Sequence, residues 1–163
     1  FAAFYRHVTK TYGLAPKACL LAQSRGGVNH YNFAADHPQW VQCVAGIYPV
    51  GDLRSYPGLK RAAPMYHLTE EELAAQLAEH NPIDRLAPIA RAGIPILHVH
   101  GDADRVVPLA ENSQAISARY RQLGGPMDLA VVPGKGHQYD PSFFESPGML
   151  DFLLAQVGHA PRQ

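Results

Sequence analysis

The sequence predicts an α/β fold in which helices cover both faces of a mostly parallel sheet, in three layers. Short apolar runs rich in Val, Ile and Leu alternate about four times with segments of helical spacing. Continuous apolar runs of this kind are typical of parallel strands, which are buried on both faces. The chain has 163 residues, 47% of them hydrophobic, which is enough for one domain with its own core.

The predicted strands are bounded by turn-forming residues. Pro16 precedes the first strand, which runs into Ser24, while Pro49 and Gly51 interrupt the second. Strands are expected over residues 18–22, 40–50, 94–100 and 129–132.

The predicted helices have recognisable start and stop signals. Gly13 and Pro38 follow the first two helices, and Thr69 with Glu72 forms a capping-box pattern at the start of the third. Helices are expected over residues 1–12, 25–36, 70–80, 111–123 and 147–157. The irregular start of residues 53–79, between the second and third strands, predicts a cap-like insert.

Composition and charge narrow the classes of partner. The formal net charge is +0, which gives no reason to expect nucleic acid or an anionic membrane surface as a partner. No apolar run approaches the roughly 20 residues of a membrane span. Cys19 and Cys43 lie in predicted strands, where we expect buried free thiols rather than a disulfide, so they leave the cellular compartment open.

Ser24 is the strongest candidate for a catalytic residue. It ends an apolar run and is followed by Arg25, Gly26 and Gly27, which is close to the nucleophile-elbow pattern G-x-S-x-G with Ala22 in the first Gly position. Small residues suit this sharp strand-to-helix turn, because the backbone of a neighbouring segment passes close by. The pattern predicts that Ser24 is a nucleophile.

A serine nucleophile needs a base and an acid that orients the base. Asp104 lies in a loop after the third predicted strand, and His137 follows the fourth. The carboxyl ends of parallel strands meet at one edge of a sheet, where ligands and catalytic residues of α/β folds gather. We therefore expect Asp104 to orient His137 and His137 to activate Ser24, while Asp102 shapes the turn.

The motifs resemble the C-terminal part of an α/β-hydrolase of the prolyl-oligopeptidase-like and dienelactone-hydrolase-like esterase branch. The residues that carry the resemblance span residues 22–27, 81–84, 100–108 and 134–137. The order Ser, Asp, His is that of α/β-hydrolases. The resemblance implies a serine hydrolase that needs no cofactor or metal, either a carboxylic ester hydrolase acting on a small ester or acyl substrate or a peptidase of the S9 type.

The resemblance also assigns supporting residues. The backbone N–H of Arg25 is expected to supply part of an oxyanion hole at the start of the following helix. Gln23, Tyr56, Met65 and Tyr66 are expected to line a substrate pocket, although the last three could equally pack the insert onto the sheet.

Two alternatives remain open from the residues. His98, His100 and Asp102 match the start of an H-x-H-x-D metal-hydrolase signature, although Ala103 stands where a further His is needed. The other alternative is an inactive or partner-dependent half-domain. The family has strands ahead of the elbow and residue 1 is Phe, so we expect a trimmed or incomplete form of a longer protein. We also expect a homo-oligomer, a dimer with two-fold symmetry, to bury the open edge at residues 18–22.

Overall fold

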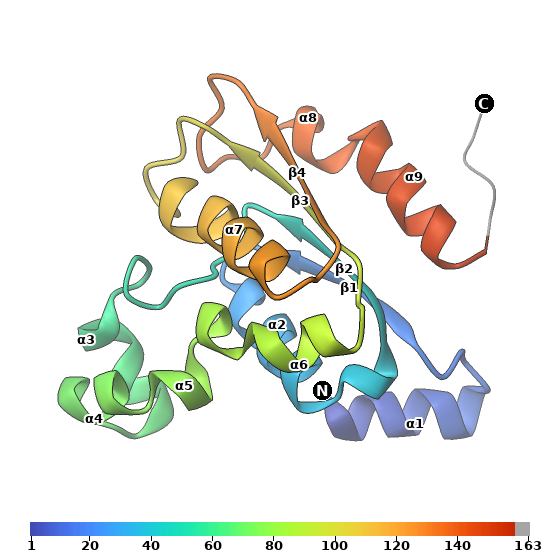
Figure 1. The fold of residues 1–163 in the computed structure, drawn as a ribbon, viewed down its shortest axis with the longest axis horizontal. Coiled ribbons are helices and arrows are strands. Elements are labelled where there is room, and N and C mark those ends of the chain that lie inside the picture. The colour runs from blue at the N-terminus through green and yellow to red at the C-terminus, as the bar shows by residue number, and fades with distance from the viewer. Residues whose placement is uncertain (159–163) are drawn as a thin grey trace.

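A computed structural model describes residues 1–158 of the chain and confirms the predicted fold class. A four-stranded parallel sheet in the order β1-β2-β3-β4 forms the middle layer (Figure 1). The strands are β1 (Ala18–Gln23), β2 (Val41–Ile47), β3 (Ile96–Gly101) and β4 (Met127–Val132). Because every strand runs in the same direction, all four carboxyl ends lie at one edge of the sheet.

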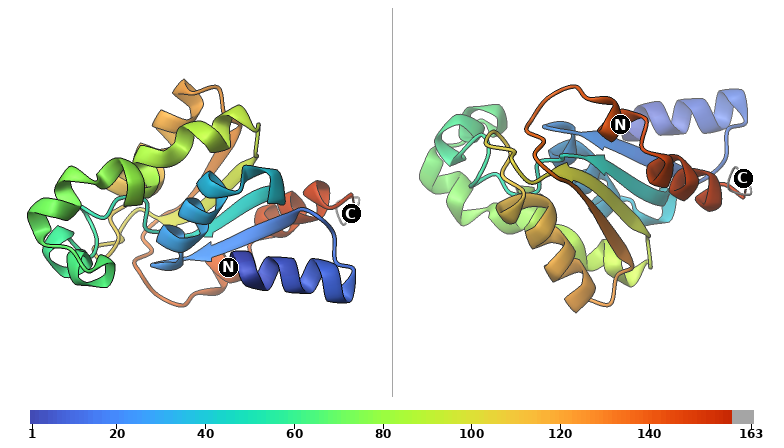
Figure 2. Two further views of the ribbon diagram at one scale, coloured as in Figure 1. Left: turned by 90° about the horizontal axis from the view of Figure 1, so that it is seen from below. Right: turned by 90° about the horizontal axis from the view of Figure 1, so that it is seen from above.

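Helices cover both faces of this sheet. The helices are α1 (Ala2–Tyr12), α2 (Gly26–Asp36), α3 (Leu59–Ala62), α4 (Glu70–Ala75), α5 (Leu77–His80), α6 (Leu86–Arg91), α7 (Ala115–Gln122), α8 (Pro141–Phe144) and α9 (Pro147–Gln156). Figure 2 shows α2, α6 and α7 on one side of the sheet and α9 on the other. Side chains of α2, α6 and α7 form the main core against their face, and those of α8 and α9 pack against the opposite face.

The structure differs from the predicted elements at their ends and in the insert, and it has two further short helices, α6 and α8. Residues 38–40 form a 3₁₀ turn ahead of β2, and β4 begins two residues earlier than expected. Residues 110–114 form a wide π-type turn that leads into α7. The capping box of Thr69 and Glu72 is present at the start of α4, with both reciprocal hydrogen bonds.

The insert, which carries α3, α4 and α5, lies beyond the carboxyl ends of the strands (Figure 2), and α6 then returns along the sheet to β3. Its own small core includes Leu53, Ala62 and Leu73. Side-chain amides fix its base to the sheet: Asn112 Oδ1 accepts from the amide of Gly51 at 2.9 Å, and Asn81 Oδ1 accepts from the amide of Leu53 at 2.8 Å. The insert is therefore held beside the edge where the candidate catalytic residues lie.

The two cysteines are paired, which corrects the expectation of free thiols. Cys19 of β1 and Cys43 of β2 stand opposite each other in the strand register and form a disulfide. The two Cα atoms lie 4.5 Å apart, within the range that a disulfide spans. This register, which spacing along the chain does not specify, is the physical reason for the pairing.

β1 lies at one end of the strand order and has β2 as its single neighbour among the described strands. Leu21, in the middle of β1, is 51% exposed.

None of the helices in residues 1–158 has both the length and the apolar character that crossing a membrane requires.

We propose that the chain self-associates through the open edge of β1, because an unpaired strand with exposed apolar side chains is a template for pairing. Light scattering at micromolar concentration is expected to give the mass of a dimer. The variant Leu21→Lys, which places a charge on the edge, should shift the mass towards that of a monomer. A wild-type chain that stays monomeric would contradict the proposal.

Candidate active site

Ser24 occupies a sharp turn between β1 and α2. Its backbone has φ 48°, in the left-handed region that residues other than Gly rarely adopt. The turn is fixed on both sides: the Ser24 amide donates to the carbonyl of Ile47 at 3.0 Å, and the Ser24 carbonyl accepts from the amide of Val50 at 2.8 Å. This strained, pinned turn is the geometry of a nucleophile elbow.

The two glycines after Ser24 differ in how much space surrounds the position of a Cβ. A Cβ on Gly27 would lie 2.8 Å from the backbone nitrogen of Val50 and still closer to its carbonyl oxygen. A Cβ on Gly26 would meet only the His30 side chain, at 3.6 Å. The close approach of α2 to the segment after β2 therefore depends on Gly27, whereas Gly26 has room for a small side chain.

Loops from opposite halves of the chain bring three side chains together. The Ser24 Oγ lies 2.8 Å from His137 Nε2, and His137 Nδ1 lies 2.7 Å from Asp104 Oδ2. Ser24 follows β1, Asp104 follows β3 and His137 follows β4. The structure thus joins the three predicted catalytic residues in one continuous hydrogen-bonded series.

Asp104 is held from both of its carboxylate oxygens. Oδ1 accepts hydrogen bonds of 2.9 Å from the backbone amides of Val106 and Val107, which leaves Oδ2 for His137. Asp102 lies elsewhere and accepts a 2.6 Å hydrogen bond from the amide of Gly134. It links the loop of Asp104 to the loop of His137, which fits the turn-shaping role expected of it.

Tyr48 supports the histidine and was not singled out by the sequence patterns. Its ring packs on the His137 ring with centroids 4.4 Å apart. Its hydroxyl accepts a 3.2 Å hydrogen bond from Gln23 Nε2, and burial raises the pKa of the Tyr48 phenol. Gln23, which was expected in a substrate pocket, therefore holds the Tyr48 side chain that packs on His137.

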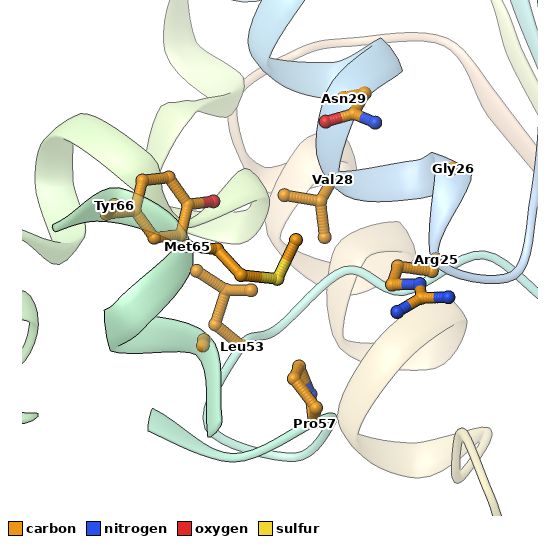
Figure 3. A pocket seen from close by; sticks show the side chains of 9 residues that line it. Arg25, Gly26, Val28, Asn29, Leu53, Pro57, Met65 and Tyr66 are labelled. Carbon is orange, nitrogen blue, oxygen red and sulfur yellow. The ribbon is translucent and has the colours of Figure 1, made fainter. Parts of the chain in front are cut away.

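A cavity of about 300 Å³ opens next to the elbow (Figure 3). Its lining is mostly apolar and comes from the start of α2 and from the insert: Arg25, Gly26, Val28, Asn29, Leu53, Pro57, Ala62, Met65 and Tyr66. Two of the predicted pocket residues, Met65 and Tyr66, line it. Tyr56 does not, and instead packs against the core of the insert.

The start of α2 provides a free donor beside Ser24. Within residues 1–158, the backbone N–H of Arg25 donates no hydrogen bond, while the amide of Gly27 donates to the Ser24 carbonyl at 2.9 Å. The first amides of an 11-residue helix carry the positive end of its dipole. This position favours negative charge that develops next to the Ser24 Oγ.

The histidines of the metal-hydrolase alternative are engaged in other contacts. His98 bonds to Tyr31 and Ser113, and His100 bonds to Ser113 and the Val107 carbonyl. The described part of the chain holds no group of three or more His, Cys, Asp or Glu side chains arranged for a metal ion. The pattern H-x-H-x-D therefore has a different structural use here.

A parallel α/β sheet with a serine elbow after one strand, and an aspartate and a histidine after two others, defines an α/β-hydrolase fold. The model of the prolyl oligopeptidase family matches residues 1–158, and the chain belongs to this family. This membership confirms the resemblance noted from the motifs.

Solved structures agree on the fold. A puromycin-hydrolysing peptidase from Mycobacterium tuberculosis superposes with a TM-score of 0.78 at 16% identity, over 99% of this chain and 25% of its own. A truncated carbohydrate esterase from gut microbiota superposes with a TM-score of 0.76 at 20% identity, over 96% of this chain and 66% of its own. TT1662 from Thermus thermophilus superposes with a TM-score of 0.67 at 23% sequence identity, over 91% of this chain and 58% of its own.

The chain spans about a quarter of the length of the puromycin-hydrolysing peptidase. A comparison with curated protein sequences found no match.

Proposed function

We propose that the chain is a serine hydrolase in which Ser24 is the nucleophile, His137 the base and Asp104 the orienting acid. The observation that carries this proposal is the series from Ser24 Oγ to His137 Nε2 at 2.8 Å and from His137 Nδ1 to Asp104 Oδ2 at 2.7 Å. Membership of the prolyl oligopeptidase family supports the assignment.

In the proposed reaction Ser24 Oγ attacks the acyl carbon of the substrate and its proton passes to His137 Nε2. The Asp104 carboxylate stabilises the imidazolium and holds its Nδ1–H. The bond to the leaving group then breaks, the leaving group takes the proton from His137, and an acyl-enzyme remains. Water attacks this ester by the same route and releases the acid and free Ser24.

The Arg25 N–H is the oxyanion donor in this scheme, because it is unpaired and lies at the start of α2 beside Ser24. One oxyanion donor contributes on the order of 10²–10³ in rate. With this donor alone the chain should be a weak esterase on activated short-chain esters, and a second donor supplied by a partner would raise the rate.

We propose a carboxylic ester as the substrate, with its acyl group in the apolar cavity beside Arg25. The cavity walls formed by Val28, Leu53 and Met65 suit a compact apolar acyl group. The second candidate is peptidase activity of the S9 type, which the family membership favours. Both reactions share the acyl-enzyme and differ in the leaving group, an alcohol or an amine.

Labelling with a fluorophosphonate probe tests the proposal, since only a serine activated by a base reacts with it. The probe is expected on Ser24 in the wild-type chain and in the control Ser142→Ala, which removes an exposed serine hydroxyl. Ser24→Ala should abolish both labelling and turnover of a p-nitrophenyl ester. Labelling that persists in Ser24→Ala, or its absence from wild type, would contradict the proposed function and favour an inactive domain.

A further inference from the structure

Behind Asp104 lies a fully buried polar cluster that the proposed reaction does not use. It consists of Tyr31 on α2, His98 and His100 on β3, and Ser113 at the turn before α7. His98 and His100 are two residues apart on a strand, so their side chains share one face of the sheet, and both reach the same hydroxyl. Ser113 Oγ lies 2.8 Å from His98 Nδ1 and 2.7 Å from His100 Nδ1.

Both histidines are neutral in this environment. Burial lowers the pKa of His98 to about 3, with the neighbouring His100 acting in the same direction, and burial also lowers the pKa of His100. Burial raises the pKa of the Tyr31 phenol, which keeps its proton. Each ring therefore carries one N–H and one unprotonated nitrogen.

One carbonyl group determines every proton position in the cluster. The Val107 carbonyl, 2.9 Å from His100 Nε2, can only accept, so His100 Nε2 carries the hydrogen and His100 Nδ1 does not. The Ser113 hydroxyl must donate to that bare Nδ1. Its single hydrogen is then used, so His98 Nδ1 donates to the Ser113 oxygen. His98 Nε2 is left to accept from Tyr31, 2.6 Å away.

The hydrogen bonds of this series all run in one direction and end at the loop that carries Asp104. Each hydrogen points from Tyr31 through His98 and Ser113 to His100, and the His100 Nε2 atom also lies 3.4 Å from Asp104 Oδ2. Oδ2 is the oxygen that holds His137. The carbonyl that His100 fixes belongs to Val107, whose amide donates to Asp104 Oδ1.

We infer that His100 is a positioning residue for Asp104, held in its Nε2–H tautomer by the hydrogen-bond order of Tyr31, His98 and Ser113. The inference rests on the proposed function for its effect on the reaction. His100 anchors the loop that carries the acid and presents a positive N–H edge to the carboxylate. It thereby keeps Oδ2 in line with the His137 Nδ1–H, and Ser113 acts through His100.

The proton order is tested by long-range proton–nitrogen NMR of the imidazole rings in the wild-type chain. His98 should be protonated at Nδ1 and His100 at Nε2, so the two neighbouring histidines should show opposite tautomers. Neither should titrate in the physiological pH range. Matching tautomers, or a His100 protonated at Nδ1, would overturn the inference. This readout needs no substrate and stands apart from the outcome for Ser24.

The positioning effect is tested with Ser113→Ala against the matched control Ser117→Ala. Ser117 is buried on α7, four residues after Ser113, and within residues 1–158 the hydroxyl contacts of His98 and His100 Nδ1 go to Ser113 and not to Ser117. Ser113→Ala should lower kcat and the rate of Ser24 phosphonylation about tenfold, equivalent to about 1.4 kcal/mol, with KM unchanged. The His137 Nδ1 proton should exchange faster with water, and Ser117→Ala should change none of these.

A double-mutant cycle separates positioning from general destabilisation. Glutamine at position 100 offers a donor near the place of Nε2 that does not depend on Ser113. His100→Gln should therefore retain most of the activity, and adding Ser113→Ala to it should have little further effect. If Ser113→Ala lowers kcat equally in both backgrounds, or no more than Ser117→Ala does, the positioning role is wrong. A wild-type chain that the probe leaves unlabelled would instead contradict the proposed function.

Discussion

Asp104→Asn is expected to lower kcat by about 10⁴ while leaving the fold intact, the size of effect that follows when the orienting acid of a Ser-His-Asp triad becomes an amide. The local geometry gives the reason. The amides of Val106 and Val107 require an acceptor at Oδ1, so the asparagine NH₂ must occupy the place of Oδ2. It then donates to His137 Nδ1, which moves the ring hydrogen to Nε2 and leaves no base for Ser24.

Asp102→Asn is the matched control, because it makes the same change two residues away. Asp102 only accepts a hydrogen bond from the Gly134 amide, and an asparagine oxygen can accept it equally well. Turnover of a p-nitrophenyl ester and the rate of fluorophosphonate labelling should therefore stay near wild type. If Asp102→Asn is the variant that loses activity while Asp104→Asn keeps it, the acid has been assigned to the wrong residue.

Gly101→Ala should be a strongly damaging single-methyl change at the site. A Cβ on Gly101 would lie 2.7 Å from the carbonyl carbon of Lys135, closer still to its oxygen, and 3.1 Å from its Cβ. The loop of His137 must then move away from β3. We expect a loss of about 1–3 kcal/mol of stability, as in other overpacked sites, and an activity loss of about 100-fold from misplacing His137.

Gly136→Ala adds the same methyl to the other side of this contact. There a Cβ would make ordinary contacts, 3.6 Å from the Ala103 oxygen and 3.8 Å from Gln138 Oε1. Its stability should stay within about 0.5 kcal/mol of wild type. Thermal unfolding and ester turnover of both variants check the pair, and equal losses would show that crowding at Gly101 is not the cause.

The layers and the strand direction could be predicted because apolar runs and turn residues mark them locally. The predicted and observed strands overlap in all four cases, and the predicted strand order placed Ser24, Asp104 and His137 after the first, third and fourth strands, where the structure has them. The ends of β2 and β4 could not be predicted to the residue. Continuous apolar sequence extends past the end of β2, so hydropathy alone does not mark where its pairing stops. In β4 the charged Asp128 separates Met127 from the apolar run, so the pattern places the start of the strand too late.

Features that depend on how distant segments align with one another could not be predicted from the sequence. The Cys19–Cys43 disulfide exists because β1 and β2 align these residues, and 24 residues of separation carry no sign of this. The same holds for Tyr48 against His137 and for Ser113 between His98 and His100. The spacing of the two histidines indicated a shared face, but not that a hydroxyl from the turn before α7 would meet both.

The order of strands also divides the candidate active site into parts of unequal stability. Ser24 and His137 follow β1 and β4, the outer strands of the described sheet, whereas Asp104 follows β3, which is paired on both sides. Strands with one neighbour open locally at a lower free-energy cost than inner strands do. We therefore expect a brief opening of an outer strand to move Ser24 and His137 apart while Asp104 stays in place. The cross-strand disulfide opposes this opening at β1, and β4 has no such covalent link among the described residues.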